Sequence, residues 1–481
     1  MSTQSANPRT GQVFGPIFPD TSSQETFTIL ESALSAFNTW NRTPAAERGR
    51  ALAAVADALD AHKEELASLA DSETGLGLPR LTGEIARTTY QIRTFVDALG
   101  EGKFVTASLD PAVDAPPQQG HPKFLRSVRG IGVVAIFGAN NFPFAFSVFG
   151  GDTASALAAG CSVVIKAHPS HPQTSQKIFD IAQAALIGAG APAGLISLGH
   201  GLSFGRDVIT DSLVSAGAFT GSHRGGRALF DLAQSRTNPI PFYGELGSIN
   251  PVVLLASGYT DATTFATAYI DSLLLGSGQF CTNPSVTFIP NEPGLLAEIE
   301  KQLASRDPQP LLSDATKLQH DQNRESLKSA LPFRVLHGKE ASSTGFFSDP
   351  EVLVLPSNQI SGEAIFETEC FGPTGVVITY ESVTDVIAQL EKLGGALAGS
   401  VFSAVDDPNA GEVIEALARV CGRVAWNAWP TGVSVTAGQQ HGGPYPSATS
   451  PLHTSVGIHA MERFLRPVTF QGFPDELTST Y

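Results

Sequence analysis

One cysteine of this sequence lies in a setting that suits a reactive group. Cys281 falls in GSGQFCTNPS, residues 276–285, where it follows an apolar run and is then surrounded by turn-forming residues. A structural cysteine usually lies among other hydrophobic side chains, whereas loops on a rigid scaffold are where proteins present reactive groups. The residue types leave two interpretations open: a reactive thiol, or a thiol buried at the end of a helix.

A second stretch has the composition of a phosphate-binding turn. AFTGSHRGGRALF places Gly221 and Ser222 after an apolar run and Gly226 at the start of a predicted helix. Backbone N–H groups at such a helix start can bind phosphate, although a plain strand-to-helix turn has the same composition. The dinucleotide fingerprint GxGxxG is absent, and the nearest match, GHGLSFG at 199–205, has the wrong spacing.

The elements that must position these stretches alternate between strands and helices. Strands that are apolar throughout indicate parallel sheets covered on both faces, so the sequence predicts an α/β protein with ligands at the carboxyl ends of its strands. The predicted strands are 131–138, 162–167, 194–199, 216–222, 240–247, 250–256, 285–290, 351–356, 375–380, 398–403 and 423–427. Residues 23–100 are predicted to be helical, 103–129 to form two strands around a loop, and 463–474 to form a strand that leaves the body.

The composition of the chain indicates which classes of partner it does not bind and in which compartment it lies. The chain has 481 residues, which predicts two or three domains, and a formal net charge of −16, which argues against nucleic acid or an anionic membrane as partner. Residues 141–165 are nearly uncharged, but Pro143, Gly150 and Asp152 interrupt them, so we expect loop, helix, turn and strand rather than a membrane span. The four cysteines are far apart, and the N-terminus lacks a secretory pattern. These features predict a cytoplasmic protein with no metal site.

Six motifs, in order, resemble those of the NAD(P)-dependent aldehyde dehydrogenase superfamily. They are FGANNFP, VVIKAHPSHPQTS, AFTGSHRGG, ELGSINP, GQFCTNP and ECFGP, and the resemblance covers about residues 21–466. QQHGGPYPSATS and RFLRPVTFQ are similar to the branch containing α-ketoglutaric semialdehyde (2,5-dioxopentanoate) dehydrogenases, and also to the NADP-dependent fatty aldehyde dehydrogenase of luminous bacteria.

The resemblance implies the aldehyde dehydrogenase fold and a division of the chain. A Rossmann-like cofactor domain is expected at 1–106 and 128–246, and an α/β catalytic domain at 247–450. A small β oligomerisation element is expected at 107–127 and 451–481, and it implies a homodimer or a dimer of dimers.

The resemblance also implies the roles of three catalytic residues. Cys281 matches the cysteine whose thiolate attacks the aldehyde carbon and is left as a thioester after hydride has passed to the nicotinamide. Glu245 matches the general base, and we expect burial beside Phe242 and Leu246 to raise its pKa. Asn141, which directly precedes Phe-Pro, matches the asparagine that holds the oxyanion with the backbone N–H of Cys281. By residue type alone, Glu245 would be a surface glutamate and Asn141 a turn former.

The cofactor is predicted to be NADP in preference to NAD. Lys166 matches the lysine that meets the adenosine ribose. Family members that prefer NAD often carry a glutamate three residues later, and Pro169 at that position removes its repulsion of a 2′-phosphate. His168, Lys166 and Arg206 are then expected to hold that phosphate. The remaining predicted cofactor contacts are Gly221, Ser222 and Gly226 at the turn, and Glu369 and Phe371 at the nicotinamide ribose and ring.

The predicted reaction is oxidation of 2,5-dioxopentanoate to 2-oxoglutarate. A substrate with a carboxylate and a ketone requires cationic or polar donors, and Arg87 and Gln91 lie four apart on one helix face. A solvated helix face is the alternative for this pair. Phe142 is predicted to contact the substrate, and with Phe146 and Phe280 it would instead suit an apolar tunnel for medium-chain or long-chain aldehydes.

Two other classes of protein fit the sequence less well than this reaction does. A thiol esterase or hydrolase that uses Cys281 needs a histidine base, and none of the eleven histidines lies in a recognisable cysteine-hydrolase motif. A relative that only binds cofactor is disfavoured by the complete set Cys281, Glu245 and Asn141.

Overall fold

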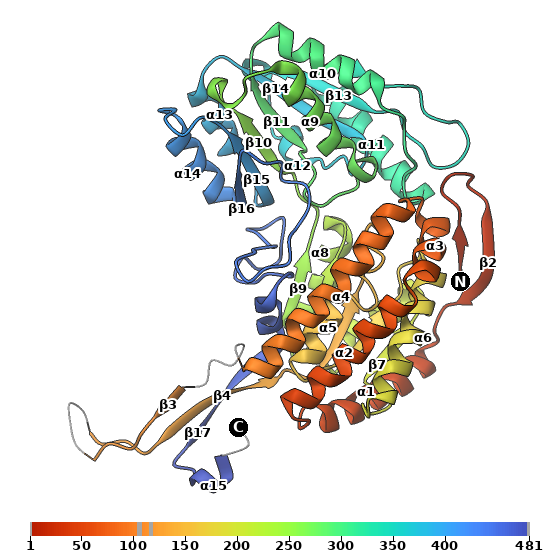
Figure 1. Cartoon of the computed structure of the whole chain (residues 1–481), viewed down its shortest axis with the longest axis vertical. Helices are drawn as coiled ribbons and strands as arrows, with labels where there is room; N and C mark the ends of the chain where they lie inside the picture. Colours follow the sequence, from red (N-terminus) through yellow and green to blue (C-terminus); the bar gives the residue numbers. More distant parts are fainter. Residues whose placement is uncertain (1, 103–107, 115–118, 479–481) are drawn as a thin grey trace.

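Two large sheets lie in two lobes, one above the other in Figure 1. The computed structural model describes residues 2–102, 108–114 and 119–478. The predicted strand at 103–110 therefore lies partly outside the described residues. The α/β architecture expected from the alternating pattern is confirmed.

The first sheet is parallel, with strand order β7-β6-β5-β8-β9. Its central strand β5 is apolar and buried along its whole length, and β6 is buried except at its last residue, Lys166, so helices cover both faces. Helices α1, α7 and α8 pack on one face, and α2, α4, α5 and α6 on the other. The strands are β5 (Val133–Phe137), β6 (Ser162–Lys166), β7 (Ile196–Gly199), β8 (Val214–Thr220) and β9 (Phe242–Glu245). The helices are α1 (Ser23–Trp40), α2 (Ala45–Ala61), α3 (Lys63–Thr74), α4 (Leu78–Glu101), α5 (Gly151–Ala158), α6 (Pro172–Gly188), α7 (Leu202–Thr210) and α8 (His223–Gln234).

The second sheet has the order β12-β13-β14-β11-β10-β15-β16, and all neighbouring strands are parallel except β12 and β13. Helices α9 and α10 cover one face, and α11 to α14 cover the other. Its strands are β10 (Pro251–Leu254), β11 (Val286–Pro290), β12 (Arg334–His337), β13 (Glu351–Pro356), β14 (Thr374–Tyr380), β15 (Ala396–Phe402) and β16 (Cys421–Trp426). Its helices are α9 (Ala262–Leu274), α10 (Pro293–Ser305), α11 (Asp314–Ala330), α12 (Ala364–Glu367), α13 (Val383–Leu390) and α14 (Ala410–Val420).

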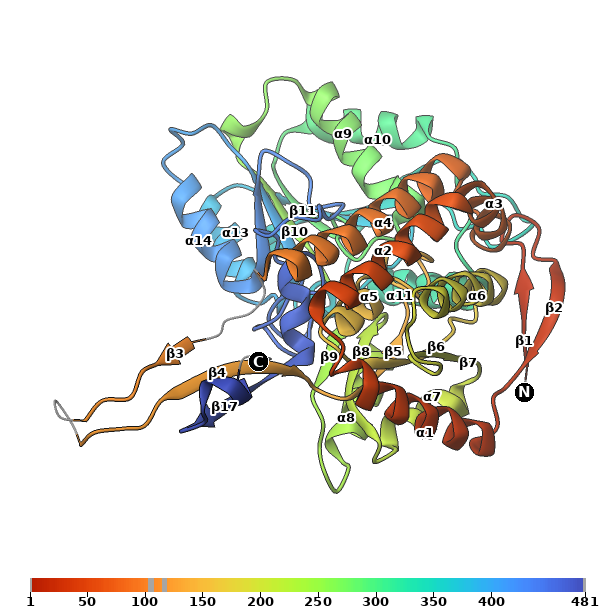
Figure 2. The ribbon, with the colours of Figure 1, turned by 60° about the horizontal axis from the view of Figure 1, so that its bottom comes forward.

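A three-stranded antiparallel arm projects from the body, as Figures 1 and 2 show. It consists of β3 (Ser108–Asp110), β4 (Phe124–Gly130) and β17 (Leu465–Gln471), followed by the short α15 (Asp475–Thr478). The C-terminal strand leaves the body as expected, and it pairs with β4 of its own chain along all seven residues.

Two features of the fold bear on the sequence predictions. An N-terminal hairpin of β1 (Ser2–Ala6) and β2 (Val13–Pro19) was not expected, and it packs against α3 and α6. The stretch 141–165 forms a loop, α5, a turn and β6, as predicted. None of the helices in the described part of the chain is both long enough and apolar enough to cross a membrane.

Candidate active site

The site lies where the two large sheets face each other end to end. Lys166 and Glu245 are the last residues of β6 and β9, so they stand at the carboxyl edge of the first sheet. Asn250, Cys281 and Glu369 all come shortly before strands of the second sheet, β10, β11 and β14, at its amino edge. Parallel strands deliver their ends to one edge, which explains why residues far apart in sequence meet here.

The loop that carries Cys281 is held from several sides. Its backbone turns sharply at Gly276 and Ser277, both with φ of 57°, and Gln279 is fully buried and accepts a hydrogen bond from Leu312 N. Asn250 Nδ2 donates to the carbonyl oxygens of Cys281 (2.8 Å) and Asn283 (2.9 Å). The thiol is therefore presented by a fixed loop rather than packed in a hydrophobic core.

The Cys281 thiol, the His441 imidazole and the Glu245 carboxylate form a buried cluster. His441 Nε2 lies 2.9 Å from Glu245 Oε1 and 3.6 Å from Cys281 Sγ, and the reactive atoms of all three lie within 4.8 Å of one another. Glu245 Oε1 receives no well-directed hydrogen bond from the described residues, so it can still accept a proton.

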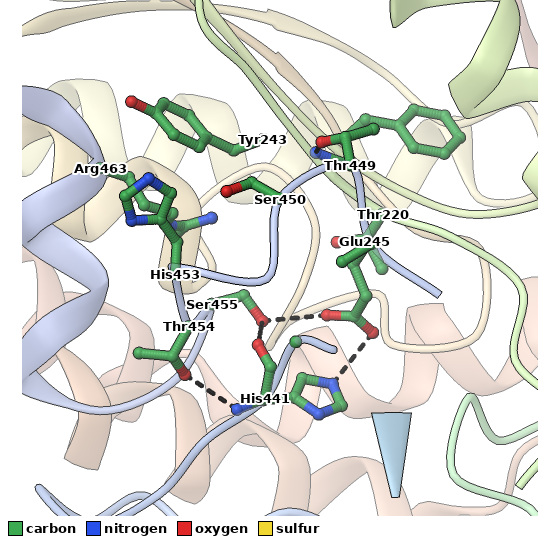
Figure 3. Close-up of a pocket in the computed structure, with 14 residues that line it drawn as sticks. Thr220, Tyr243, Glu245, His441, Thr449, Ser450, His453, Thr454, Ser455 and Arg463 are labelled. Atoms are coloured by element: carbon green, nitrogen blue, oxygen red, sulfur yellow. Dashed lines mark hydrogen bonds and ion pairs between the residues drawn. The ribbon is translucent and has the colours of Figure 1, made fainter. Parts of the chain in front are cut away.

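Residues that follow β16 hold His441 and Glu245 in place (Figure 3). Ser455 Oγ donates to Glu245 Oε2 at 2.9 Å, and Thr454 Oγ1 accepts from His441 N at 2.9 Å. A bridge between Glu245 and Ala448 and a hydrogen bond from Leu246 N to Ser447 O tie β9 to the same segment. A small cavity behind Glu245 is lined by His453, Ser455 and Arg463 among others.

The electrostatics of this cluster correct one sequence prediction. Glu245 is buried beside Phe242 and Leu246, as expected, and burial acts to raise its pKa. However, the charge of His441 and contacts with His441, Ser455 and Cys281 outweigh burial, so the pKa of Glu245 is lowered, and the predicted rise was wrong. Burial and then the Glu245 charge raise the pKa of the Cys281 thiol well above its ordinary value. The resting pair is thus a neutral thiol beside a carboxylate.

The two candidate oxyanion residues point to different places. Asn141 is buried, and its Nδ2 donates to Gln279 O at 3.0 Å, two residues before Cys281. Asn140 Nδ2 is directed instead toward Thr316 Oγ1, at 3.5 Å. The geometry therefore supports Asn141, rather than its neighbour, as the amide donor near the reacting carbon.

An aromatic wall stands beside the thiol. Phe142 makes edge-to-face contacts with Phe146 and Phe280, with ring centroids 5.4 and 5.2 Å apart, and Phe146 lies 5.8 Å from the His441 ring. Arg80 lies between Phe142 and Phe280 and donates to Asn141 O at 2.6 Å. These contacts fix both the wall and the backbone of Asn141.

The two predicted substrate contacts, Arg87 and Gln91, both lie on helix α4. The Arg87 guanidinium lies 5.2 Å from the Phe146 ring centroid, and its Nε donates to Val433 O at 3.2 Å. Gln91 is buried with an amide nitrogen that has no hydrogen-bond partner among the described residues. That nitrogen lies next to Gly151, 3.6 Å from where a Cβ at that position would be. The solvated-face alternative is wrong for both side chains, and substrate contact stays a prediction.

The turn before α8 is built as a helix start, and a dinucleotide phosphate fits it. Ser222 is the N-cap, with its hydroxyl accepting from Gly225 N, and Gly221 precedes it at the carboxyl end of β8. A Cβ on Gly226 would lie 2.1 Å from Leu246 Cδ2, so only glycine lets α8 pack this closely on the sheet. The close packing leaves the first backbone N–H groups of α8 at the sheet edge where phosphates bind.

The predicted adenosine contacts differ in charge. Lys166 is largely buried, and burial lowers its pKa to about 8 despite the nearby Asp20 carboxylate. His168 stacks on His171, accepts from Ser170 N, and has its pKa lowered far below the ordinary value by burial and by Lys166. A neutral His168 can still share a hydrogen bond with a phosphate, and its contact with the 2′-phosphate stays a prediction. Arg206 is exposed on α7.

The predicted nicotinamide-side residues lie between the two sheets. Glu369 Oε1 accepts from Ser248 N at 3.3 Å, and burial raises the pKa of Glu369 to about 7. Phe371 is half-buried in the same segment. The Glu369 charge also raises the pKa of Cys281, which places this carboxylate in electrostatic range of the thiol. A ribose hydroxyl could donate to the ionised form of Glu369.

Sequence reasoning missed three residues of the site. His441 lies within QQHGGPYPSATS, a motif that was assigned no catalytic role. A histidine in a motif shared with related enzymes is a candidate proton carrier, and this residue type could have indicated its role. Asn250 lies within ELGSINP, again without an assigned role. Asp20 comes from the N-terminal segment, next to Gly201 and Lys166, and no local pattern marks it.

The fold and the site define a dinucleotide-dependent aldehyde dehydrogenase. The chain belongs to the aldehyde dehydrogenase family, whose sequence pattern matches residues 1–469. It is an NAD(P)-dependent oxidoreductase.

Two relatives that are similar to this chain over nearly its whole length share one substrate in their names. The chain is 38% identical to α-ketoglutaric semialdehyde dehydrogenase 2 of Azospirillum brasilense, over 96% of this chain and 89% of that protein. It is 35% identical to α-ketoglutaric semialdehyde dehydrogenase of Acinetobacter baylyi, over 97% and 90%. Its fold is similar to that of an NADP-dependent enzyme of E. coli, with a TM-score of 0.83, 24% identity, and 98% and 94% of the two chains covered.

Proposed function

We propose that the chain oxidises 2,5-dioxopentanoate, α-ketoglutaric semialdehyde, to 2-oxoglutarate through a thioester on Cys281. The observation that carries the reaction type is the Glu245 carboxylate held within 4.8 Å of the Cys281 thiol, with His441 close to both. The two relatives that bear this substrate in their names support the choice of aldehyde.

The residues of the cluster divide the work. Glu245 Oε1 takes the thiol proton, and His441 Nε2 stabilises the carboxylate and the thiolate that forms. The thiolate attacks the aldehyde carbon, and the oxygen of the adduct is stabilised by Asn141 Nδ2 and the Cys281 backbone N–H. When bound, the nicotinamide supplies the hydride acceptor that turns the adduct into a thioester. Glu245 releases the thiol proton to solvent, then takes a proton from a water that attacks the thioester carbon, and returns it to the departing sulfur, so that the acid and the thiol are freed.

A cysteine hydrolase fits this geometry less well. In a hydrolase triad, one ring nitrogen of the histidine contacts the carboxylate and the other contacts the nucleophile. Here the same nitrogen, His441 Nε2, lies close to both Glu245 and Cys281. Ester hydrolysis would therefore be a side reaction of the thiolate.

The remaining predictions complete this proposal. We propose NADP as the preferred cofactor because Pro169 stands where NAD-preferring family members often have a glutamate. The Asp20 carboxylate, in electrostatic range of Lys166, acts against this preference. The projecting arm supports a homodimer, since β17 and β3 are the outer strands of its sheet and Leu109 on β3 is exposed. The four free cysteines support a reducing compartment such as the cytoplasm.

Steady-state kinetics with a panel of aldehydes tests the proposal. NADPH formation is followed at saturating NADP with 2,5-dioxopentanoate, succinic semialdehyde, pentanal and decanal. We expect the highest kcat/KM with 2,5-dioxopentanoate. A clear preference for decanal would support the apolar-tunnel alternative, and an equal rate for a Cys281→Ser variant would reject the thioester.

A further inference from the structure

Two arginines from different lobes converge on one loop beside the thiol. Arg87, on α4, donates from Nε to Val433 O at 3.2 Å. Arg423, on β16, donates from Nη2 to Pro430 O and to Gly432 O, the latter at 3.0 Å. The loop 430–433 thus binds both side chains through backbone carbonyls alone.

This loop is part of the wall around Cys281. Gly432 N donates to Thr282 Oγ1 at 3.0 Å, and Thr282 directly follows Cys281. On the other side, the Arg87 guanidinium lies over Phe146, whose ring contacts His441. Both guanidiniums lie in electrostatic range of the Cys281 sulfur. The two arginines, the loop and the thiol therefore lie close to one another.

Neither guanidinium is fully satisfied within the part of the chain that the structure describes. Arg87 Nη2 and Arg423 Nε are both buried without a hydrogen-bond partner, and neither arginine has an ion pair among those residues. Glu84 lies in electrostatic range of Arg87, but its Oε1 accepts from Phe144 N and Ala145 N, and its buried Oε2 makes no hydrogen bond to either arginine. A buried donor without an acceptor is costly, and a buried charge more so, unless an anion completes the site.

We propose that Arg87 and Arg423 together bind the carboxylate of an ω-oxo acid whose aldehyde carbon lies at Cys281. This inference rests on the proposed function and adds a recognition residue, Arg423, that no sequence motif indicated. Guanidinium groups bind carboxylates through paired N–H···O hydrogen bonds, and a carboxylate is the anionic group of the proposed substrate. The aromatic wall of Phe142 and Phe146 encloses the carbon chain between the two ends of the substrate.

The test compares aldehydes of equal chain length with and without the carboxylate. The variants are Arg87→Gln and Arg423→Gln, and the matched control is Arg93→Gln, which removes an arginine from the outer face of α4 where it pairs with Asp57 and Asp60. Each is assayed with 2,5-dioxopentanoate and pentanal, and with succinic semialdehyde and butanal. We expect Arg87→Gln and Arg423→Gln to lower kcat/KM for the oxo acids by roughly 10- to 100-fold more than for the uncharged aldehydes of the same length, and Arg93→Gln to change all four values by less than about twofold.

A second measurement does not depend on turnover. Glutarate carries carboxylates but no aldehyde, and its dissociation constant by calorimetry should rise at least about tenfold in both variants and less in Arg423→Lys, which keeps the charge. Equal losses with charged and uncharged aldehydes, or unchanged glutarate binding, would overturn the arginine pair. By contrast, a parent enzyme that oxidises pentanal better than 2,5-dioxopentanoate would overturn the proposed substrate, whatever the variants do.

Discussion

His441 Nε2 lies 2.9 Å from Glu245 Oε1, and both groups are almost completely buried. The same nitrogen is 3.6 Å from Cys281 Sγ, so the imidazole stands at the meeting point of the nucleophile and its base. Together with the contacts from Ser455 and Cys281, this contact lowers the pKa of Glu245 against the effect of burial.

Replacing His441 should slow formation of the thioester. In His441→Gln the ring that stabilises both the carboxylate and the forming thiolate is lost, and we expect the pre-steady-state burst of NADPH to slow by about 10²-fold. His453→Gln is the matched control, because His453 lines the cavity behind Glu245 but contacts only the Tyr243 ring among the aromatic side chains described. An unchanged burst rate in His441→Gln would show that Glu245 acts alone.

Removing the Glu245 charge should change two measurements in opposite directions. The Glu245 carboxylate raises the pKa of Cys281, so Glu245→Gln lowers that pKa and increases the thiolate fraction at pH 8. Iodoacetamide should then alkylate Cys281 faster, with its midpoint at lower pH, while kcat falls by roughly 10²- to 10⁴-fold because the base is missing.

The control for that experiment is Glu462→Gln, an exposed glutamate that contacts only His459 among the described residues. It should change neither the alkylation midpoint nor kcat. An unchanged alkylation midpoint in Glu245→Gln would contradict the charge effect described here, because it would mean that burial alone sets the pKa of the thiol.

The sequence predicted the strands better than it predicted the site. Continuous apolar runs are a local signal, and the strands ending at Lys166 and Glu245 form as expected. His441 contacts Cys281 although the two residues are 160 positions apart in the sequence, and no spacing rule predicts a contact of that kind. The predicted direction of the Glu245 pKa shift was wrong for the same reason. Phe242 and Leu246 predict burial, which raises the pKa, whereas the contacts that lower it come from His441 and Ser455, far away in the sequence. Exposed residues fill most of β2, so hydrophobic patterning did not indicate the N-terminal hairpin.

Asp20 should limit the use of NADP. Its carboxylate lies in electrostatic range of Lys166 and next to Gly201, at the edge where the adenosine ribose is expected. A 2′-phosphate would be repelled there, so Asp20→Asn should raise the ratio of kcat/KM for NADP over NAD by about three- to tenfold. Asp207→Asn on α7, whose carboxylate accepts from Ser23 instead, is the control and should leave the ratio unchanged. A ratio that falls in Asp20→Asn would place the 2′-phosphate elsewhere.

Zinc should inhibit the enzyme at the catalytic cluster. No metal site was predicted from the sequence, but Cys281, His441 and Glu245 present a thiol, an imidazole and a carboxylate within 4.8 Å of one another. A tetrahedral ion with Zn–S of about 2.3 Å and Zn–N of about 2.0 Å holds those two atoms roughly 3.5 Å apart, close to the observed 3.6 Å.

We expect micromolar Zn²⁺ to abolish turnover, EDTA to restore it, and Mg²⁺, which prefers oxygen ligands, to have no effect at the same concentration. Co²⁺ should give a sulfur-to-metal absorption band that is lost in Cys281→Ser and weakened in His441→Gln, because each substitution removes one of the three ligands. Zinc inhibition of equal strength in the parent and in His441→Gln would show that the ion acts at a different site, since two remaining ligands bind it far more weakly than three.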